Sequence, residues 1–397
     1  MKSSDEIFRL IKSMTKKERN FFRKKMLPYY SDDGNYLKLF DEIAAQADEG
    51  DTYDESKVKG GEYAGKFIKN LSVHKNYMYG MLLESLRLCS ANKPAAELRN
   101  MITEAQILFD KLLFDQSLKI IRKAMKLAHE KNLTLSQYDL INLERNILKY
   151  TATVEEYIDK SPALFDRQYE VLKQCENTVD FYRLNEDAGI FLRSYGAGRV
   201  RDEKQMKEFD RTFNNPLLQD ESEAKTFQSR YIFFLLNMQK NSTLERWAEA
   251  YDYAKKAANL WEENPSMLDG PVENYIFSLS NLINASIRAG KHEETERALE
   301  RFRRLPENFP DTITENSKVF IFYSHSVHEI SHNMMQHRVK ELEESIERIS
   351  SSMAEYENSI SLYQRIILYY FLSTGNFMLE KFDKCTYWNA KIFNLEK

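Results

Sequence analysis

Apolar residues recur three and four positions apart along almost the whole chain, and polar residues fill the positions between them. This spacing has the period of an α-helix and would place the apolar side chains on one face. No convincing stretch alternates apolar and polar residues between hairpin turns, as half-buried strands would. The pattern therefore predicts an all-α fold.

Local signals indicate where several helices should begin. Capping boxes are expected at Thr15–Glu18, Ser136–Asp139 and Ser242–Glu245, where a hydroxyl accepts a backbone N–H and an acid reaches back to another. Pro162 is expected at the first position of a helix, where its missing N–H has no cost. Together these signals predict helices separated by short turns.

Residues 1–92 form the first predicted domain, a group of short helices around an acidic loop at residues 46–65. The loop is expected to bury little because it is rich in charge and glycine. A long helix at residues 65–88 should end this domain. Its core-facing side chains are predicted to be Phe67, Leu71, Met78, Met81 and Leu82.

From residue 93 to residue 397, helices are expected in antiparallel pairs joined by short polar turns. The clearest pair lies at residues 274–306, where Gly290 separates two helices and small or apolar residues recur on facing sides. Weaker versions occur at residues 103–131 and 368–394, and residues 241–265 resemble the second helix of a further pair whose first helix is expected at residues 224–239. The positions that carry the pattern in the clearest pair are Leu282, Ile283, Ser286, Thr295, Leu299 and Phe302.

This pattern resembles the tetratricopeptide repeat, with a threonine in place of the usual alanine at Thr295 and a bulky residue at Phe302. The resemblance implies an α-solenoid, a superhelix in which each pair buries one face against the next and leaves a concave groove. Helix lengths at residues 136–215 and 316–357 depart from the pattern.

The last predicted helix is not followed by a polar capping helix. The chain is therefore predicted to be truncated after this helix or to meet a partner on its apolar face. The apolar residues of this last helix are Trp388, Ile392, Phe393 and Leu395.

Composition narrows the possible classes of protein. The chain has 397 residues, of which only 12 are glycine and 8 proline, and its formal net charge is −4. Such a charge gives no global attraction to nucleic acid or to anionic membranes. The three cysteines are far apart, and neither a signal peptide nor a long apolar run is present. A soluble cytoplasmic protein with no membrane contact is expected.

The most specific chemical motif is His-Glu-Ile-Ser-His at residues 328–332, which matches the H-E-x-x-H pattern of zinc peptidases. A zinc metallohydrolase would use His328 and His332 as ligands and Glu329 as general base, with Glu355 as the one candidate third ligand. The surrounding sequence favours another interpretation. An apolar stripe is predicted on the core side of this helix, and His325, His328 and His332 are predicted together on its opposite face. The stripe consists of Phe320, Tyr323, Val327, Ile330 and Met334.

A second alternative concerns the N-terminus. Residues 1–30 contain nine Lys or Arg against three acids, whereas residues 31–55 contain nine acids against one Lys. A basic helical head on a repeat domain is similar to the arrangement of peptide-responsive bacterial regulators and would bind nucleic acid. The opposite charges of the two segments could instead neutralise each other. The cations concerned are Lys16, Lys17, Arg19, Arg23, Lys24 and Lys25.

No phosphate-binding loop, cofactor motif or nucleophile arrangement can be assembled from the spacing. The sequence therefore favours a non-enzymatic scaffold that binds a peptide or protein segment along the concave face, with no cofactor. The exposed residues expected to contribute are Arg288 and the three histidines His325, His328 and His332.

Overall fold

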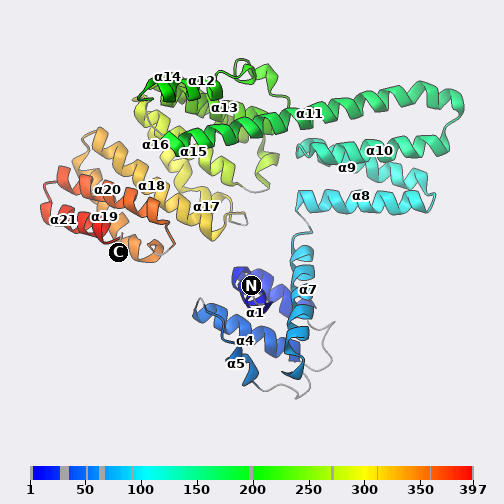
Figure 1. Cartoon of the computed structure of the whole chain (residues 1–397), viewed down its shortest axis with the longest axis horizontal. Helices are drawn as coiled ribbons and strands as arrows, with labels where there is room; N and C mark the ends of the chain where they lie inside the picture. The colour runs from blue at the N-terminus through cyan, green and yellow to red at the C-terminus, as the bar shows by residue number, and fades with distance from the viewer. Residues whose placement is uncertain are drawn as a thin grey trace. The chain divides into compact units, whose positions relative to one another are not determined.

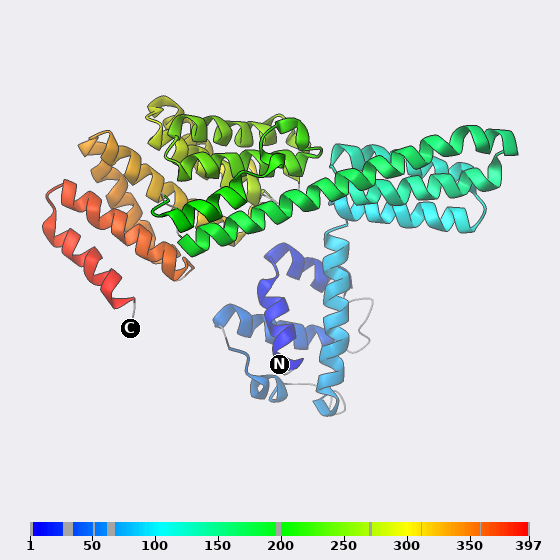
Figure 2. The ribbon, with the colours of Figure 1, turned by 45° about the horizontal axis from the view of Figure 1, so that its top comes forward.

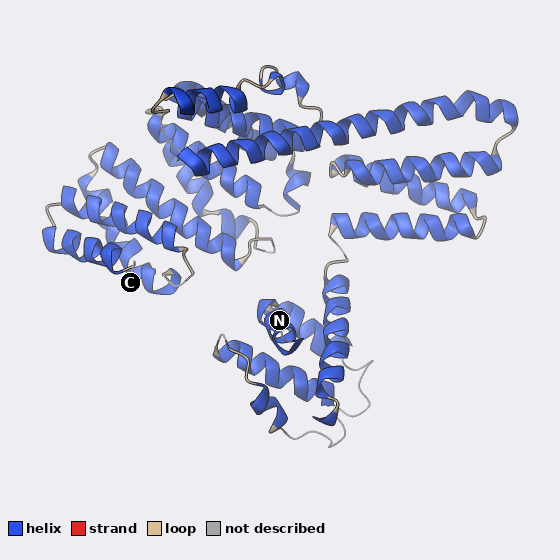
Figure 3. Ribbon diagram, in the orientation of Figure 1, coloured by secondary structure: helices blue, strands red, loops and turns tan. Residues whose placement is uncertain are grey.

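The structure is a computed structural model that describes residues 3–26, 35–50, 52–61, 68–91, 93–195, 200–269, 272–310, 312–357 and 359–395. Throughout these residues the chain is helical and contains no strand, which confirms the all-α prediction (Figure 3). Contacts divide the chain into unit one, Met1–Asn100, and unit two, Met101–Lys397. The division falls within helix α8, Pro94–Asp110, a few residues after the predicted boundary at residue 92.

Unit one packs its helices around a single apolar core. Phe22, Phe40 and Met78 are fully enclosed in this core. The predicted capping box at Thr15–Glu18 begins α2 and is confirmed by both of its hydrogen bonds. The helices of this unit are α1 (Ser3–Ser13), α2 (Lys16–Phe21), the π-helical η1 (Phe22–Met26), α4 (Asn35–Glu49), α5 (Glu55–Lys59) and α7 (Leu71–Cys89).

The predicted acidic loop is more ordered than its composition suggested. Helix α4 runs into it as far as Glu49, and α5 occupies part of the remainder. Val58 is fully buried, and Glu55 pairs at 3.3 Å with Lys75, a buried lysine on α7. A charged segment can pack against an apolar core when one of its carboxylates pairs with a cation that is itself buried in that core. Phe67 of the predicted stripe lies outside the described residues, whereas Leu71, Met78, Met81 and Leu82 are buried as expected.

Unit two begins with a bundle of antiparallel helices that leads into one very long helix. After α8 come α9 (Phe114–Glu130), α10 (Thr134–Thr151) and α11 (Val154–Tyr195), which has 42 residues (Figure 1). The prediction that Pro162 starts a helix is wrong. Thr153 and Glu156 cap α11 reciprocally instead, and the helix continues through Pro162 without the hydrogen bond that this residue cannot donate.

Helix α11 connects the bundle to an array of helix pairs. Its first half packs on α10 and its second half on α12 and α13, as Figure 2 also shows. The remaining elements are α12 (Glu203–Phe213), η2 (Pro216–Leu218), η3 (Glu221–Glu223), α13 (Phe227–Thr243), α14 (Trp247–Glu262), η4 (Pro265–Asp269), α15 (Glu273–Arg288), α16 (His292–Arg303), α17 (Leu305–Asn308), α18 (Glu315–Met335), α19 (Val339–Tyr356), α20 (Leu362–Met378) and α21 (Phe382–Asn394).

The four pairs of the array are α13–α14, α15–α16, α18–α19 and α20–α21. Each pair packs against the next, because α14 contacts α15, α16 contacts α18 and α19 contacts α20. Small residues allow close approach where helices meet; Ala250 and Ala254 of α14 are buried, and so is Thr295 of α16. This packing is the α-solenoid expected from the sequence.

Six helix–helix turns of unit two have the same backbone geometry. In each, one residue has a positive φ, and the next donates its N–H to the carbonyl five positions earlier at 2.8–3.0 Å. The positive-φ residues are Leu112, Asn132, Glu245, Gly290, His337 and Glu380.

The expected capping boxes at Ser136 and Ser242 are wrong, because Ser136 lies inside α10 and Ser242 lies near the end of α13.

The shared turn also changes the interpretation of residues 316–357. Their helix lengths depart from the repeat pattern, yet α18 and α19 are joined at His337 by the same turn as the other pairs.

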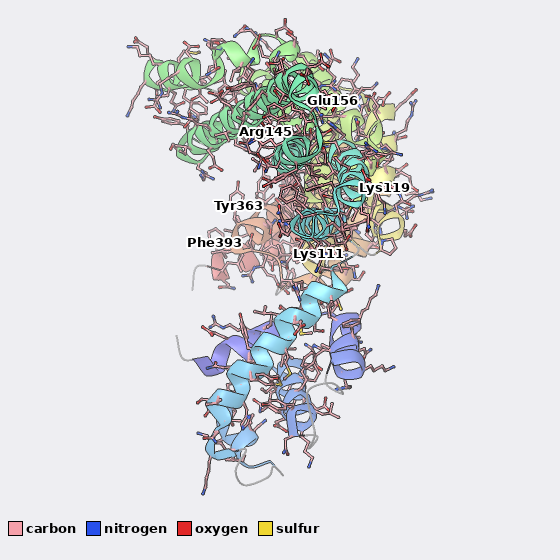
Figure 4. The ribbon with its side chains drawn as sticks, turned by 90° about the vertical axis from the view of Figure 1, so that its right-hand side faces the viewer. Lys111, Lys119, Arg145, Glu156, Tyr363 and Phe393 are labelled. Carbon is pink, nitrogen blue, oxygen red and sulfur yellow. The ribbon has the colours of Figure 1, made fainter. Side chains whose placement is uncertain are left out.

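In the final helix, α21, Trp388 is buried against Tyr369. Phe393, which is labelled in Figure 4 together with Tyr363, is 75 % exposed. The final helix therefore buries one of its predicted apolar residues and exposes another.

Candidate functional site: a groove lined by amides and aromatics

A groove of about 410 Å³ lies between α11, α13 and α15 in unit two. Ten described residues line it, and none of them is charged, although 30 % of the chain is. Five are amides, three are aromatic and two are aliphatic. The lining consists of Tyr182, Asn185, Gln228, Tyr231, Ile232, Leu235, Gln239, Asn274, Phe277 and Asn281.

Helical spacing places these side chains on one side of each helix. On α13 the lining residues Gln228, Ile232, Leu235 and Gln239 follow one another at intervals of four, three and four. On α15 Asn274, Phe277 and Asn281 follow at intervals of three and four, and on α11 Tyr182 and Asn185 are three apart. Residues at these intervals share one helix face. The groove is therefore formed by the facing surfaces of three packed helices.

The polar atoms of the groove are only partly used within the protein. The Tyr231 hydroxyl donates to the Asn274 carbonyl at 3.3 Å. The Oε1 atom of Gln239 is buried and has no hydrogen-bond partner among the described residues. A buried amide oxygen without a partner loses its interaction with water, so a bound donor would stabilise it. At the rim, Tyr182 and Phe277 are 48 % and 45 % exposed and offer flat apolar faces.

Sequence reasoning missed this groove, although a signal was present. Gln228 and Gln239 are eleven positions apart, and Asn274 and Asn281 seven apart, which are intervals that return to the same helix face. The apolar residues of α13 and α15 drew attention to their core sides instead. Which polar face meets which depends on how α11, α13 and α15 pack.

The histidine-bearing helix α18 has no free face. Neighbouring helices α15, α16, α19 and α20 all contact it. Of the predicted apolar stripe only Ile330 is fully buried, while residues on other sides, such as Ser324 and His332, are also buried. The expectation of one core face and one exposed histidine face is therefore wrong. Four neighbours enclose the helix from all sides, which a single amphipathic pattern does not predict.

The three histidines lie within about 60° of one another around α18, but they meet different helices. The Nε2 atom of His328 is 3.0 Å from Ser280 Oγ of α15, and this hydroxyl is 2.6 Å from that of Ser324. The side chain is half-buried between the two helices. Desolvation by burial lowers the pKa of His328 to about 4, so its imidazole is neutral near pH 7.

His325 and His332 line a polar cleft of about 440 Å³ between α16, α18 and α19. They are poorly accessible within it, because their side chains are only 13 % and 3 % exposed. His332 Nε2 lies 3.8 Å from Glu296, which also pairs with Arg338. Burial lowers the pKa of both histidines. The expectation that these three histidines are exposed is therefore wrong.

The residues of the zinc alternative are not brought together. Both oxygens of Glu329 accept from Arg348 at 2.7 Å, and Ser345 donates to the same carboxylate at 3.1 Å. Glu355 is exposed on α19. Within the described residues, no three His, Cys, Asp or Glu side chains are placed to hold a metal ion. The geometry thus gives the pair His328 and His332 no third ligand and ties Glu329 to an arginine.

Arg288 is exposed, as predicted, at the end of α15. Its guanidinium lies 5.5 Å from the ring centroid of Trp247, the first residue of α14. A cation at this distance is attracted to the ring face. Arg288 therefore covers an aromatic residue at a turn and is not part of the amide-lined groove.

The basic N-terminal cations are partly neutralised within unit one. Arg19 pairs with Asp48 at 2.7 Å, and Arg23 pairs with Asp41, so both use carboxylates of α4. Lys16, Lys17 and Lys24 are exposed, while the side chain of Lys25 lies outside the described residues. The acidic segment therefore offsets two of the six cations that the nucleic-acid alternative requires.

No model of a known protein family matches this chain, and no curated protein matches it in sequence.

In the part of the chain that the structure describes, no helix is both long and apolar enough to cross a membrane. Cys89, Cys175 and Cys385 are free thiols.

Proposed function

We propose that the chain is a non-enzymatic interaction scaffold of the tetratricopeptide-like kind, which binds an extended, largely uncharged peptide segment in the groove between α11, α13 and α15. The amide lining of this groove is the observation that carries the proposal. Each carboxamide can donate and accept, as each peptide unit of an extended backbone can. Five amides in an uncharged groove therefore suit a main chain better than a charged small molecule.

The rim supplies a second element of recognition. Tyr182 of α11 and Phe277 of α15 are both partly exposed, and Phe277 also contacts Phe320 of α18 with ring centroids 4.7 Å apart. Aromatic residues at such sites supply much of the binding free energy and lose little conformational entropy. The peptide is expected to present apolar side chains to these rings and its backbone to the amides.

The proposal can be tested with a displayed library of random linear 12-residue peptides selected on the whole chain. Selected peptides should bind Gln239→Ala/Asn281→Ala about 5- to 150-fold more weakly, since each of the two lost amide hydrogen bonds costs about 0.5–1.5 kcal/mol. Titration by fluorescence anisotropy measures the dissociation constants.

Gln116→Ala is the matched control, because Gln116 is an exposed amide on α9, away from the groove. Peptides should bind this variant as they bind the natural chain. If they bind the groove double variant with unchanged affinity, the amide-lined groove is not their site and the proposal fails.

A further inference from the structure

Helix α11 carries a stripe of exposed apolar side chains along one face. Two exposed charged residues, Glu176 and Arg183, interrupt the stripe, and the Arg145 guanidinium of α10 lies 4.7 Å from the ring centroid of Phe165. Seven of its apolar side chains are 39–71 % exposed. At about 100° per residue they fall within about 80° of the helix circumference, and Val154, Leu172 and Ile190 are spaced by five full turns. The stripe consists of Val154, Ile158, Phe165, Tyr169, Leu172, Val179 and Ile190.

The stripe is distinct from the face by which α11 packs in unit two. Leu164 and Val171 bury the first half of the helix in the core that includes Ile141. Phe181 and Phe191 bury the second half in the core of the array. Single exposed apolar residues are normal, whereas an aligned row about 54 Å long is a typical feature of interaction surfaces.

Charge along the stripe indicates what it binds. Among the described residues, one border carries a row of five exposed carboxylates that make no ion pair. The exposed cations near them are Lys173 on that border and Arg183 within the stripe, so carboxylates outnumber cations there. Carboxylates in this position favour a partner with cations alongside its apolar residues. The five acidic residues are Glu155, Asp159, Asp166, Asp180 and Asp187.

We infer that this face of α11 docks an amphipathic helix of another protein whose apolar stripe is bordered by Lys or Arg. Antiparallel pairing with a second copy of α11 would place the five carboxylates against themselves, which is repulsive. The same carboxylates repel the phosphates of nucleic acids and anionic lipids. A basic amphipathic helix satisfies both the apolar stripe and its charged border. The site is separate from the groove between α11, α13 and α15.

A displayed library tests this inference. Its members are 28-residue helices with leucine fixed at stripe positions and with border positions randomised among Lys, Glu and Gln, selected on the whole chain. Enriched sequences should carry Lys along one border. Their affinity should fall at least tenfold in Ile158→Gln/Val179→Gln and at least threefold in Asp166→Asn/Asp180→Asn, and it should weaken with added salt.

The matched control is Leu135→Gln on α10, where a leucine is 71 % exposed outside the stripe. This variant should bind the selected helices normally. Circular dichroism of each variant verifies that unit two keeps its helical content. Enrichment of Glu borders, absence of any border preference, or binding that the stripe double variant leaves unchanged would each overturn the inference. So would sedimentation equilibrium showing a dimer that the same double variant abolishes.

Discussion

His328 illustrates how the neighbours of a side chain determine its chemistry. Its imidazole has the sequence context of a zinc ligand, yet it contacts Ser280 on α15 and stays neutral because burial lowers its pKa to about 4. Glu329, the nominal general base, accepts from Arg348. Both residues thus join α18 to neighbouring helices, and the amides of the groove take the place of the histidines as the candidate binding residues.

His328 should make stability depend on pH. In the unfolded chain this histidine protonates near pH 6.5, whereas in the folded chain it does so only near pH 4, so the unfolded state binds the proton first as pH falls. Its contribution to the free energy of unfolding is therefore complete above pH 6.5 and lost towards pH 4. Between pH 7 and pH 5 the loss is up to about 2 kcal/mol. Urea unfolding of His328→Gln should lack this part of the loss.

The comparison variant for this measurement is His129→Gln, because His129 is exposed on α9. The difference in unfolding free energy between pH 7 and pH 5 should be the same in this variant as in the natural chain. Equal pH dependence in His328→Gln and the natural chain would show that His328 is not the group responsible.

At the scale of elements, the turn with one positive φ marks the helix pairs more clearly than the repeat positions in the sequence do. Gly290 marks the turn of the clearest pair in the sequence, but Leu112, Glu245, His337 and Glu380 adopt the same positive-φ conformation. A non-glycine residue at positive φ is strained. The array therefore tolerates local strain at several turns, because packing between the paired helices offsets it.

Opposite substitutions at two of these turns should have opposite effects. Gly290→Ala should lower the free energy of unfolding by about 1 kcal/mol, because φ is 69° there and an added Cβ meets no atom within 4 Å. Leu112→Gly should leave it unchanged or raise it by up to about 1 kcal/mol, since Leu112 has a φ of 59° and is 67 % exposed. Urea titrations measure both. A stabilising Gly290→Ala would contradict a strained turn.

At the scale of the whole molecule, the chain has two compact units with separate cores. All three tryptophans, Trp247, Trp261 and Trp388, belong to unit two. Their fluorescence therefore reports the unfolding of unit two alone, while circular dichroism reports the helices of both units. This separation allows the cooperativity between the units to be measured directly.

Phe40→Ala should destabilise unit one by about 3–5 kcal/mol, because Phe40 is fully buried and packs on Phe22. The midpoint of the fluorescence transition should stay unchanged, whereas part of the circular dichroism signal should be lost at lower urea. Phe302→Ala, a fully buried phenylalanine of unit two, should shift the fluorescence midpoint. A common shift of both signals in Phe40→Ala would indicate that the units unfold together.

The periodicity by itself determined the helical class, the pairing of helices and the buried face of α7, because these depend on spacing along one chain segment. Local residue types also identified the capping box at Thr15, and the exposure of Arg288 was expected. Helix starts at Ser136, Pro162 and Ser242 were misplaced because capping residues also occur inside helices.

Only the tertiary structure decided which faces meet. It enclosed α18 between four helices, placed His328 against α15 and His325 and His332 against α16 and α19, gathered the amides of three helices into one groove and left the stripe of α11 exposed. The physical reason is that the free energy of burying a helix face depends on the surface opposite it. Spacing along the sequence specifies a face, but it contains no information on which distant face will cover it.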